Sequence, residues 1–449
     1  MDHEALAQDV LRQARARGAD EADVLLLEST EFSVTVRRGE VETLTDSGGR
    51  GLGLRVFVGR RTAHVHTSDL SPAALAALVA EAVEMARVTG EDEFAGLPDE
   101  TPAPEGVDLE LLDPAVAALP TESRIALARR AEAAALAKAG ITNSFGASYG
   151  SGETRFVLAN SRGFKGSYRR SAASLSVVPV AEAEGAMERD HWYTAATFLG
   201  DLEPPDAVGE KAAERTLRRL GARKIATCEV PVVFDPETAQ ELLSALFDAI
   251  SGDTVYRGAS FLAGRLGERV ASPLLTLVDD GRRTRGLGAR PFDGEGLPTR
   301  RNVPLEEGVL RHYLCDSYSA RRLGTRPTGS ARRGLGGDPS VGSMDLCFAP
   351  GRTPPEQIVG EVERGLLVTD LMGFGVDVVS GDYSQGVFGY WIEKGRPVHP
   401  VHEVTIAGNL RQMLLDVDAV GNDLVFRGAS ASPTIRIRRM TVSGSSAES

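Results

Sequence analysis

The chain has 449 residues, of which 42% are hydrophobic and 25% are charged, and these proportions exclude a largely disordered protein. One hydrophobic core rarely organises a chain of this length, so at least two domains are expected. Acidic residues number 63 and basic residues 50, and the resulting formal charge of -13 disfavours direct binding to nucleic acid or anionic lipid.

The first 90 residues predict two helices that flank a set of strands. A helix over 4–17 has apolar residues at helical spacing and ends before Gly18. Ser71 and Pro72 are typical of a helix start, and the second helix should run from there to about Val88. Between the helices, apolar and polar residues alternate in four segments, which indicates antiparallel strands: 23–27, 32–37, 40–45 and 51–66.

Residues 90–120 contain five prolines and several acidic residues, a composition typical of a surface linker without a packed element. A helix over 121–138 and a further helix over 208–220 are expected after this linker. Between them the pattern predicts a second set of strands, with a hairpin turn at 159–163: 144–149, 154–160, 164–175 and 194–198.

We predict a domain boundary near Thr227, because the remainder of the chain is rich in strand patterns and Gly-containing turns. Only two helices are expected there, over 236–250 and around 355–365. The sequence therefore indicates an α+β fold, with an N-terminal α/β domain (1–227, sub-regions 1–90 and 121–227) of antiparallel or mixed sheets and flanking helices. A mainly β C-terminal domain (228–444) follows, and the small polar residues 445–449 are expected to form a disordered tail.

The sequence predicts a cytoplasmic location. The first 20 residues carry charges throughout and lack the apolar run of a secretory signal, and no uncharged apolar stretch approaches the ~18 residues that a membrane span needs. Cys228, Cys315 and Cys347 are far apart and form no CxxC pair, so neither a disulfide framework nor a cysteine-rich zinc site is indicated.

Three local motifs resemble functional sites, but ordinary strand structure explains each of them better. The Gly-rich stretch 47–53 runs on into a strand pattern and not into a helix, so it favours a hairpin or bulge over a phosphate loop. Ser148 lies in a GxSxG motif, but the following residues alternate like a strand, whereas a hydrolase needs a helix there. His64 and His66 share one strand face and could be half of a metal site, although no third ligand is close in sequence.

Several longer phrases give the chain a resemblance to the TldD/PmbA family of zinc-dependent proteases, and together they span nearly its whole length. The phrases are HTSDLSP (66–72), ANSRGFKGSYRR (159–170), SFLAGRLGERV (260–270), GLPTRR (296–301), VVSGDYS (378–384) and TIAGNL (405–410). The resemblance implies an α+β N-terminal domain, a β-rich C-terminal domain, and a dimer whose active site lies in an enclosed tunnel.

The resemblance also implies a zinc site, held in TldD-type subunits by HExxxH and by a cysteine near the C-terminus. Counting back from residues 251–253 places Leu243 at the first His of this motif, Ser244 at the Glu and Asp248 at the second His. Zinc requires imidazole or thiolate donors, and a glutamate must move the proton. The region of the expected cysteine, 425–433, contains no cysteine.

The helix predicted over 236–250 is explained without a metal. Asp235 caps it, Pro236 begins it, and its apolar residues form one core-facing stripe: Ala239, Leu242, Leu243, Leu246 and Ile250.

The resemblance therefore points to the PmbA/TldE-type subunit, which lacks catalytic residues and its own metal and shapes the tunnel of a heterodimer with a TldD-type, zinc-bearing partner. Unfolded or leader peptides are the implied substrates. An exposed edge at 381–391 is predicted to hold such a peptide by strand addition. The candidate substrate-binding residues are Asp382, Tyr383, Ser384, Gln385, Gly386 and Trp391.

Two other functions stay open at this point. The chain could be a free-standing homodimer that binds a peptide or protein without cleaving it, in keeping with the gyrase-modulator description of some family members. It could also be a metal-independent hydrolase that uses Ser148 or another site. Zinc content and chelator sensitivity distinguish the three hypotheses.

Overall fold

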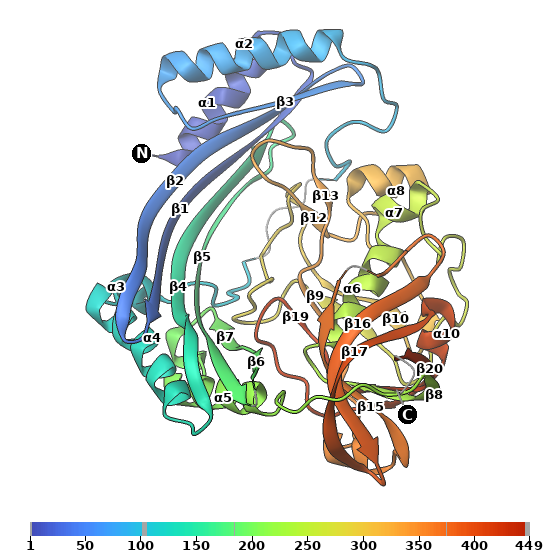
Figure 1. The fold of residues 1–449 in the computed structure, drawn as a ribbon. Coiled ribbons are helices and arrows are strands. Elements are labelled where there is room, and N and C mark those ends of the chain that lie inside the picture. Colours follow the sequence, from blue (N-terminus) through green and yellow to red (C-terminus); the bar gives the residue numbers. More distant parts are fainter. Residues whose placement is uncertain (1, 101–105, 184, 374, 445–449) are drawn as a thin grey trace.

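The computed structural model describes residues 2–100, 106–183, 185–373 and 375–444, and Figure 1 shows their arrangement. The predicted tail at 445–449 lies outside the described residues. One long, curved sheet with helices at both ends forms the N-terminal part, and two smaller sheets around a central helix form the C-terminal part (Figure 1). The α+β fold class expected from the sequence is confirmed.

The N-terminal sheet has seven antiparallel strands in the order β3-β2-β1-β4-β5-β6, with β7 also paired to β5. Its strands are β1 (Glu21–Arg37), β2 (Glu40–Val58), β3 (Arg61–Thr67), β4 (Ile141–Asn160), β5 (Lys165–Ala183), β6 (Ala186–Arg189) and β7 (Trp192–Ala196). The two sub-regions expected from the sequence thus share one sheet, because β1 of the first pairs with β4 of the second.

The strands are longer than the sequence predicts. The polar residues 28–31 suggest a break, yet β1 continues through them with ladder partners on both β2 and β4. Backbone pairing on two sides holds a strand together even where its side chains bury nothing. The expected hairpin at 159–163 joins β4 to β5, where Asn160 Oδ1 accepts bonds from the backbone N–H groups of Arg162 and Phe164.

Two separate groups of helices cover the ends of this sheet (Figure 1). At one end lie α1 (His3–Ala16) and α2 (Pro72–Val88), which are capped by Asp2 and Ser71. At the other end lie α3 (Pro114–Ala118), α4 (Thr121–Leu136) and α5 (Pro205–Leu217), and a short 3₁₀ turn, η1 (Leu199–Asp201), precedes α5. The prediction that 90–120 lacks a packed element is wrong, because α3 lies there and Leu109, Leu111 and Val116 are buried.

The C-terminal part contains a five-stranded sheet, β11-β10-β9-β14-β19, a six-stranded sheet, β17-β16-β15-β8-β20-β18, and the pair β12-β13. The bounds of its strands up to β14 are β8 (Cys228–Phe234), β9 (Leu277–Asp280), β10 (Arg301–Glu306), β11 (Val309–Leu310), β12 (Ala331–Arg332), β13 (Ser340–Val341) and β14 (Asp345–Phe348). The remaining strands are β15 (Arg364–Met372), β16 (Asp382–Glu393), β17 (Arg396–Asn409), β18 (Val417–Val420), β19 (Ser430–Ala431) and β20 (Ile435–Ser443).

The central helix of this part is α6 (Ala239–Ile250), whose apolar residues share one core with both larger sheets. The shorter helices are α7 (Gly252–Tyr256), α8 (Ser317–Leu323), α9 (Pro355–Gly360) and α10 (Leu410–Leu415). Sequence periodicity misses α7, α8 and α10, because helices of five to seven residues depend on caps and tertiary packing more than on an amphipathic pattern. No helix within the described ranges is long and apolar enough to cross a membrane.

Close packing of α4 against α5 depends on Gly209. A Cβ atom at this position would lie 2.1 Å from the backbone oxygen of Ala131. We expect Gly209→Ala to reduce the free energy of unfolding by about 1–3 kcal/mol, because overpacking outweighs the better helix propensity of alanine. Denaturant unfolding measures the change. Gly360→Ala is the matched control, since a Cβ at this helical glycine meets nothing within 4 Å, and equal losses in the two variants would contradict the explanation.

Candidate functional site

Helix α6 occupies the place where the resemblance expects zinc ligands, and its buried side is apolar. The predicted core-facing stripe is confirmed, with each of its residues at most 2% exposed: Ala239, Leu242, Leu243, Leu246 and Ile250. The helix begins later than expected, because Pro236 lies in a turn and Thr238 is the N-cap residue. Asp235 Oδ1 still closes this turn by accepting bonds from the Thr238 backbone N–H and hydroxyl, each at 2.9 Å.

The opposite side of α6 is polar and carries Glu241, Ser244 and Asp248 at helical spacing. Glu241 accepts a 3.2 Å hydrogen bond from Gln385 Nε2 on β16, whereas Ser244 and Asp248 are exposed. The pKa of Asp248 is raised because neighbouring protein atoms partly desolvate its carboxylate. This polar face could bind a polar ligand or another protein surface.

The three positions that correspond to the family's zinc motif carry no nitrogen or sulfur donor. Leu243 is completely buried in the core and has no donor atom, Ser244 offers a weakly ligating hydroxyl, and Asp248 alone could supply a carboxylate oxygen. Across the described ranges, no three His, Cys, Asp or Glu side chains are grouped so that they could hold a metal ion. His64 and His66 do lie on one exposed face of β3, where His64 Nδ1 is 3.7 Å from Asp338 Oδ2.

Strand β16 carries the six candidate substrate-binding residues, but it cannot accept a peptide as an added strand. One edge of β16 is paired with β15 and the other with β17. Beyond the end of β15, the Ser384 N–H donates to Gly375 O at 2.7 Å, and Val376 bridges Tyr383. Strand addition at 381–391 is therefore excluded, because the backbone groups that it needs are already bonded.

The side chains of β16 divide into two sets. Asp382 and Ser384 are exposed and Gly386 is half-buried, whereas Tyr383, Gln385 and Trp391 are at most 4% exposed. The Tyr383 hydroxyl and Gln385 Oε1 are buried without a hydrogen-bond partner among the described residues. Burial, reinforced by the Glu241 carboxylate, raises the pKa of Tyr383. The structure thus bonds Gln385 to Glu241 of α6 and buries Tyr383 near the same carboxylate.

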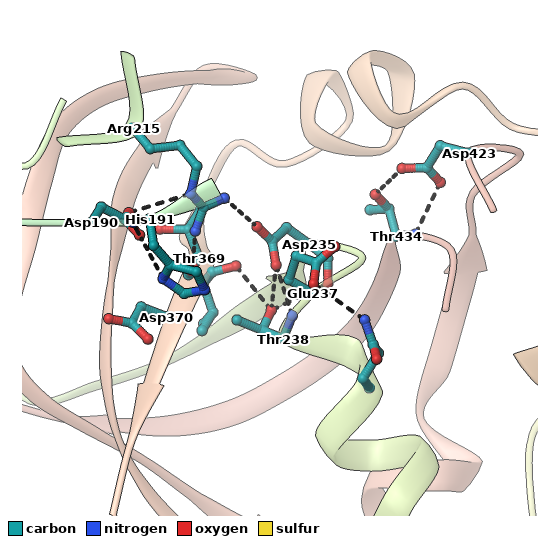
Figure 2. Close-up of polar contacts among 12 residues, drawn as sticks. Asp190, His191, Arg215, Asp235, Glu237, Thr238, Thr369, Asp370, Asp423 and Thr434 are labelled. Atoms are coloured by element: carbon teal, nitrogen blue, oxygen red, sulfur yellow. Dashed lines mark hydrogen bonds and ion pairs between the residues drawn. The ribbon is translucent and has the colours of Figure 1, made fainter. Parts of the chain in front are cut away.

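An arginine that the sequence does not single out joins the beginning of α6 to the N-terminal part, as Figure 2 shows. Arg215 of α5 places Nε 3.3 Å from Asp190 Oδ2 and Nη1 3.6 Å from Asp235 Oδ2, and Nη2 donates to Thr369 O at 2.9 Å. Burial by itself would lower the pKa of Arg215, but the carboxylates of Asp190 and Asp235 outweigh it and the pKa is raised. Arg215 therefore stays charged and bridges the two parts.

The stretch in which the resemblance expects a cysteine instead supplies Arg427. Its guanidinium pairs with Glu203 at 2.9 Å and with Glu237 at 3.5 Å, and it lies 4.5 Å from the centre of the Trp192 ring. Two hydrogen bonds from Thr434 to the Asp423 carboxylate join the chain on the two sides of Arg427 (Figure 2). Arg427 thus links the N-terminal part to the C-terminal part through ion pairs. A cysteine in this stretch would instead offer a thiolate to a metal ion.

The Ser148 motif is part of a sheet. Residues 146–150 lie within β4, and the Ser148 hydroxyl is 2.9 Å from the Thr35 hydroxyl on β1. A nucleophile elbow requires a sharp turn from strand to helix. The motif therefore lacks the geometry of a nucleophile elbow.

Comparisons with known proteins agree with the sequence resemblance. Three family models of the PmbA/TldA metallopeptidases match the chain: domain 1 at residues 22–86, the central domain at 114–220 and the C-terminal domain at 227–444. The chain is 39% identical to "Metalloprotease PmbA" of Escherichia coli O157:H7, covering 95% of this chain and 93% of that protein. In Haemophilus influenzae it resembles both a PmbA homolog (36% identity, 94% and 92% covered) and a TldD homolog (28% identity, 56% and 55% covered).

Two solved structures have the same fold. A Bacteroides thetaiotaomicron protein, described as a candidate modulator of DNA gyrase, aligns with a TM-score of 0.91 at 30% identity over 99% of both chains. TldE from Thermococcus kodakarensis aligns with a TM-score of 0.86 at 24% identity, covering 98% of this chain and 100% of the other.

We expect Arg427→Ala to weaken the contact between the two parts, because Glu203 and Glu237 lose a half-buried guanidinium. The expected loss in the free energy of unfolding is about 1.5–3 kcal/mol, measured by urea denaturation. Arg438→Ala is the control, since this arginine is 66% exposed and its Nε is 3.9 Å from Asp418, and such pairs contribute about 0–1 kcal/mol. Equal effects of the two substitutions would mean that Arg427 does not link the parts.

Proposed function

Because the chain belongs to the TldD/PmbA family of metallopeptidases, we propose that it is a non-catalytic, PmbA/TldE-type subunit of a cytosolic zinc peptidase. In this proposal a TldD-type partner holds the zinc, and this chain shapes the tunnel through which unfolded or leader peptides reach it. The observation that carries the proposal is the fully buried Leu243 in the place of the first zinc-binding histidine.

The chemistry of the α6 surface supports a structural role. Catalysis by zinc requires three protein ligands, an open position for water and a base to take its proton. Leucine, serine and a single aspartate at these positions supply none of the nitrogen or sulfur donors. Ser244 and Asp248, two of these three positions, are exposed and are therefore available to a partner surface.

The presence of two family types in one organism supports a heterodimer. Haemophilus influenzae has both a PmbA homolog and a TldD homolog, and this chain is similar over nearly its whole length to the first. A pair of related proteins, one with ligands and one without, would divide metal binding and substrate shaping between two subunits of the same fold.

The decisive experiment compares the isolated chain with a mixture. Alone, the chain should bind no stoichiometric zinc by mass spectrometry of the metal and should not cleave an unfolded peptide. Mixing with a HExxxH-bearing relative should give a one-to-one complex with both zinc and activity. A partner whose motif glutamate is replaced by glutamine is the control, since it should form the complex without activity.

Each contrary outcome identifies another function. Chelator-sensitive cleavage by the isolated chain would refute a non-catalytic role. Chelator-insensitive cleavage that is lost in Ser148→Ala would indicate a hydrolase. A stable homodimer that binds the peptide but gains nothing from the partner would indicate a free-standing binding module.

Asp382 and Ser384 are the predicted residues whose side chains can touch a peptide directly, since they are exposed on β16. In the active complex, we expect the double substitution Asp382→Ala and Ser384→Ala to raise KM about three- to tenfold with little change in kcat, because only substrate binding loses contacts. Arg396→Ala, an exposed change near the other end of the same hairpin, is the control. An unchanged KM in the double variant would remove these residues from the peptide path.

A further inference from the structure

A cavity of about 470 Å³ lies between the N-terminal part and the C-terminal part. The N-terminal part contributes the end of β2, the start of β3 and residues 90–96, and the C-terminal part contributes α7, α8 and residues 338–340. None of its lining residues belongs to α6 or β16. The cavity is therefore independent of the site on which the proposed function rests.

The walls of the cavity carry more negative than positive charge. Five carboxylates line it, those of Asp92, Asp253, Glu295, Asp316 and Asp338. Two guanidiniums also line it: Arg55 is 2.6 Å from Asp23 and 3.7 Å from Asp338, and Arg257 donates to the Tyr256 hydroxyl at 3.1 Å. The carboxylates still outnumber them. An excess of carboxylates in a confined space attracts a cation.

Aromatic rings complete the walls and already face cations nearby. Phe57, Tyr256 and Tyr318 line the cavity, and the two tyrosine rings meet edge to face with their centres 5.7 Å apart. The Arg322 guanidinium lies 5.1 Å from the centre of the Tyr256 ring. Ring faces beside carboxylates favour organic ammonium and guanidinium groups over simple ions.

Two hydroxyls in this region lack a hydrogen-bond partner within the described residues. Ser317 is 3% exposed and its Oγ is unpartnered, while its backbone N–H donates to Glu295 Oε2 at 2.8 Å. Thr62, which lines the cavity, has a buried and unpartnered Oγ1. Buried polar atoms are normally satisfied, so the Thr62 hydroxyl on the cavity wall points to a polar group that enters from the cavity, and Ser317 lies between two lining residues, Asp316 and Tyr318.

The carboxylates are also destabilised without a cation. Burial, followed by the charge of Glu295, raises the pKa of Asp316 to about 7. Burial, followed by the charge of Asp293, raises the pKa of Glu295. A bound positive charge would relieve this repulsion.

We propose that this cavity binds an alkylammonium or guanidinium group, of the kind carried by a lysine or arginine side chain or by the N-terminus of a peptide. An organic cation fits better than a metal ion, because the described residues present no group of three ligands with metal-binding geometry. Glu295 and Asp253 contact the positive group, and the rings of Tyr256 and Tyr318 enclose its apolar stem.

Calorimetric titration of the full chain tests this proposal with matched probes. The cationic probes are N-acetyl-lysine methylamide, N-acetyl-arginine methylamide and alanine methylamide, whose free α-ammonium represents a peptide N-terminus. N-acetyl-norleucine methylamide is the neutral counterpart of the lysine probe. At least one cationic probe should bind at least tenfold more tightly than the norleucine probe, and the strongest of the three identifies the source of the cation.

Variants locate the binding. Glu295→Gln and Asp253→Asn should each weaken binding of the best probe about tenfold or more, because each removes a charge-assisted contact. Asp377→Asn, an exposed change outside the cavity lining, should leave it unchanged. Circular dichroism verifies folding, and if Glu295→Gln does not fold, the half-buried Asp253 carries the test. Equal affinity of all four probes, or unchanged binding in folded cavity variants, would overturn the proposal.

Discussion

Two guanidiniums hold the beginning of α6 between the two parts of the molecule, and the arrangement of the candidate site depends on them. Arg215 reaches from α5 to Asp235, and Arg427 reaches from the C-terminal part to Glu203 and Glu237. Both arginines lie near the Trp192 ring. Because an arginine fork can bond several acceptors at once, these two side chains fix the position of α6 relative to the long sheet, and with it the direction in which its polar face points.

The packing of α6 explains why a metal site cannot be recovered by small movements. Leu243 shares a core with both C-terminal sheets, so turning this position outward would expose apolar surface and open a cavity in the interior. At the same time, Arg427 occupies the stretch in which relatives of the TldD type are expected to carry a thiolate. Core packing and ion pairs thus occupy both places where the family resemblance expects zinc ligands, which supports the proposed non-catalytic role.

Much of the local structure could be predicted from particular residues. Ser71 and Pro72 mark the start of α2, and Asn160 with Gly163 marks the hairpin between β4 and β5. The strand lengths and the pairing of β16 could not be predicted, because both depend on partners far away in the sequence. Tyr383 and Gln385, which suggest a binding surface by their chemistry, lie inside the sheet's core because β15, β17 and α6 surround them.

The sequence by itself determined that a leucine, which has no donor atom for zinc in any fold, stands at the first position of the family's zinc motif, and it determined the family through phrases spread along the chain. Only the tertiary structure decided which charges meet. Arg427 is separated from Glu203 by 224 residues and from Glu237 by 190, and the carboxylates of the cavity come from both parts of the chain. Electrostatic interactions depend on distance in space and on burial, and neither quantity is encoded in the local pattern of residues.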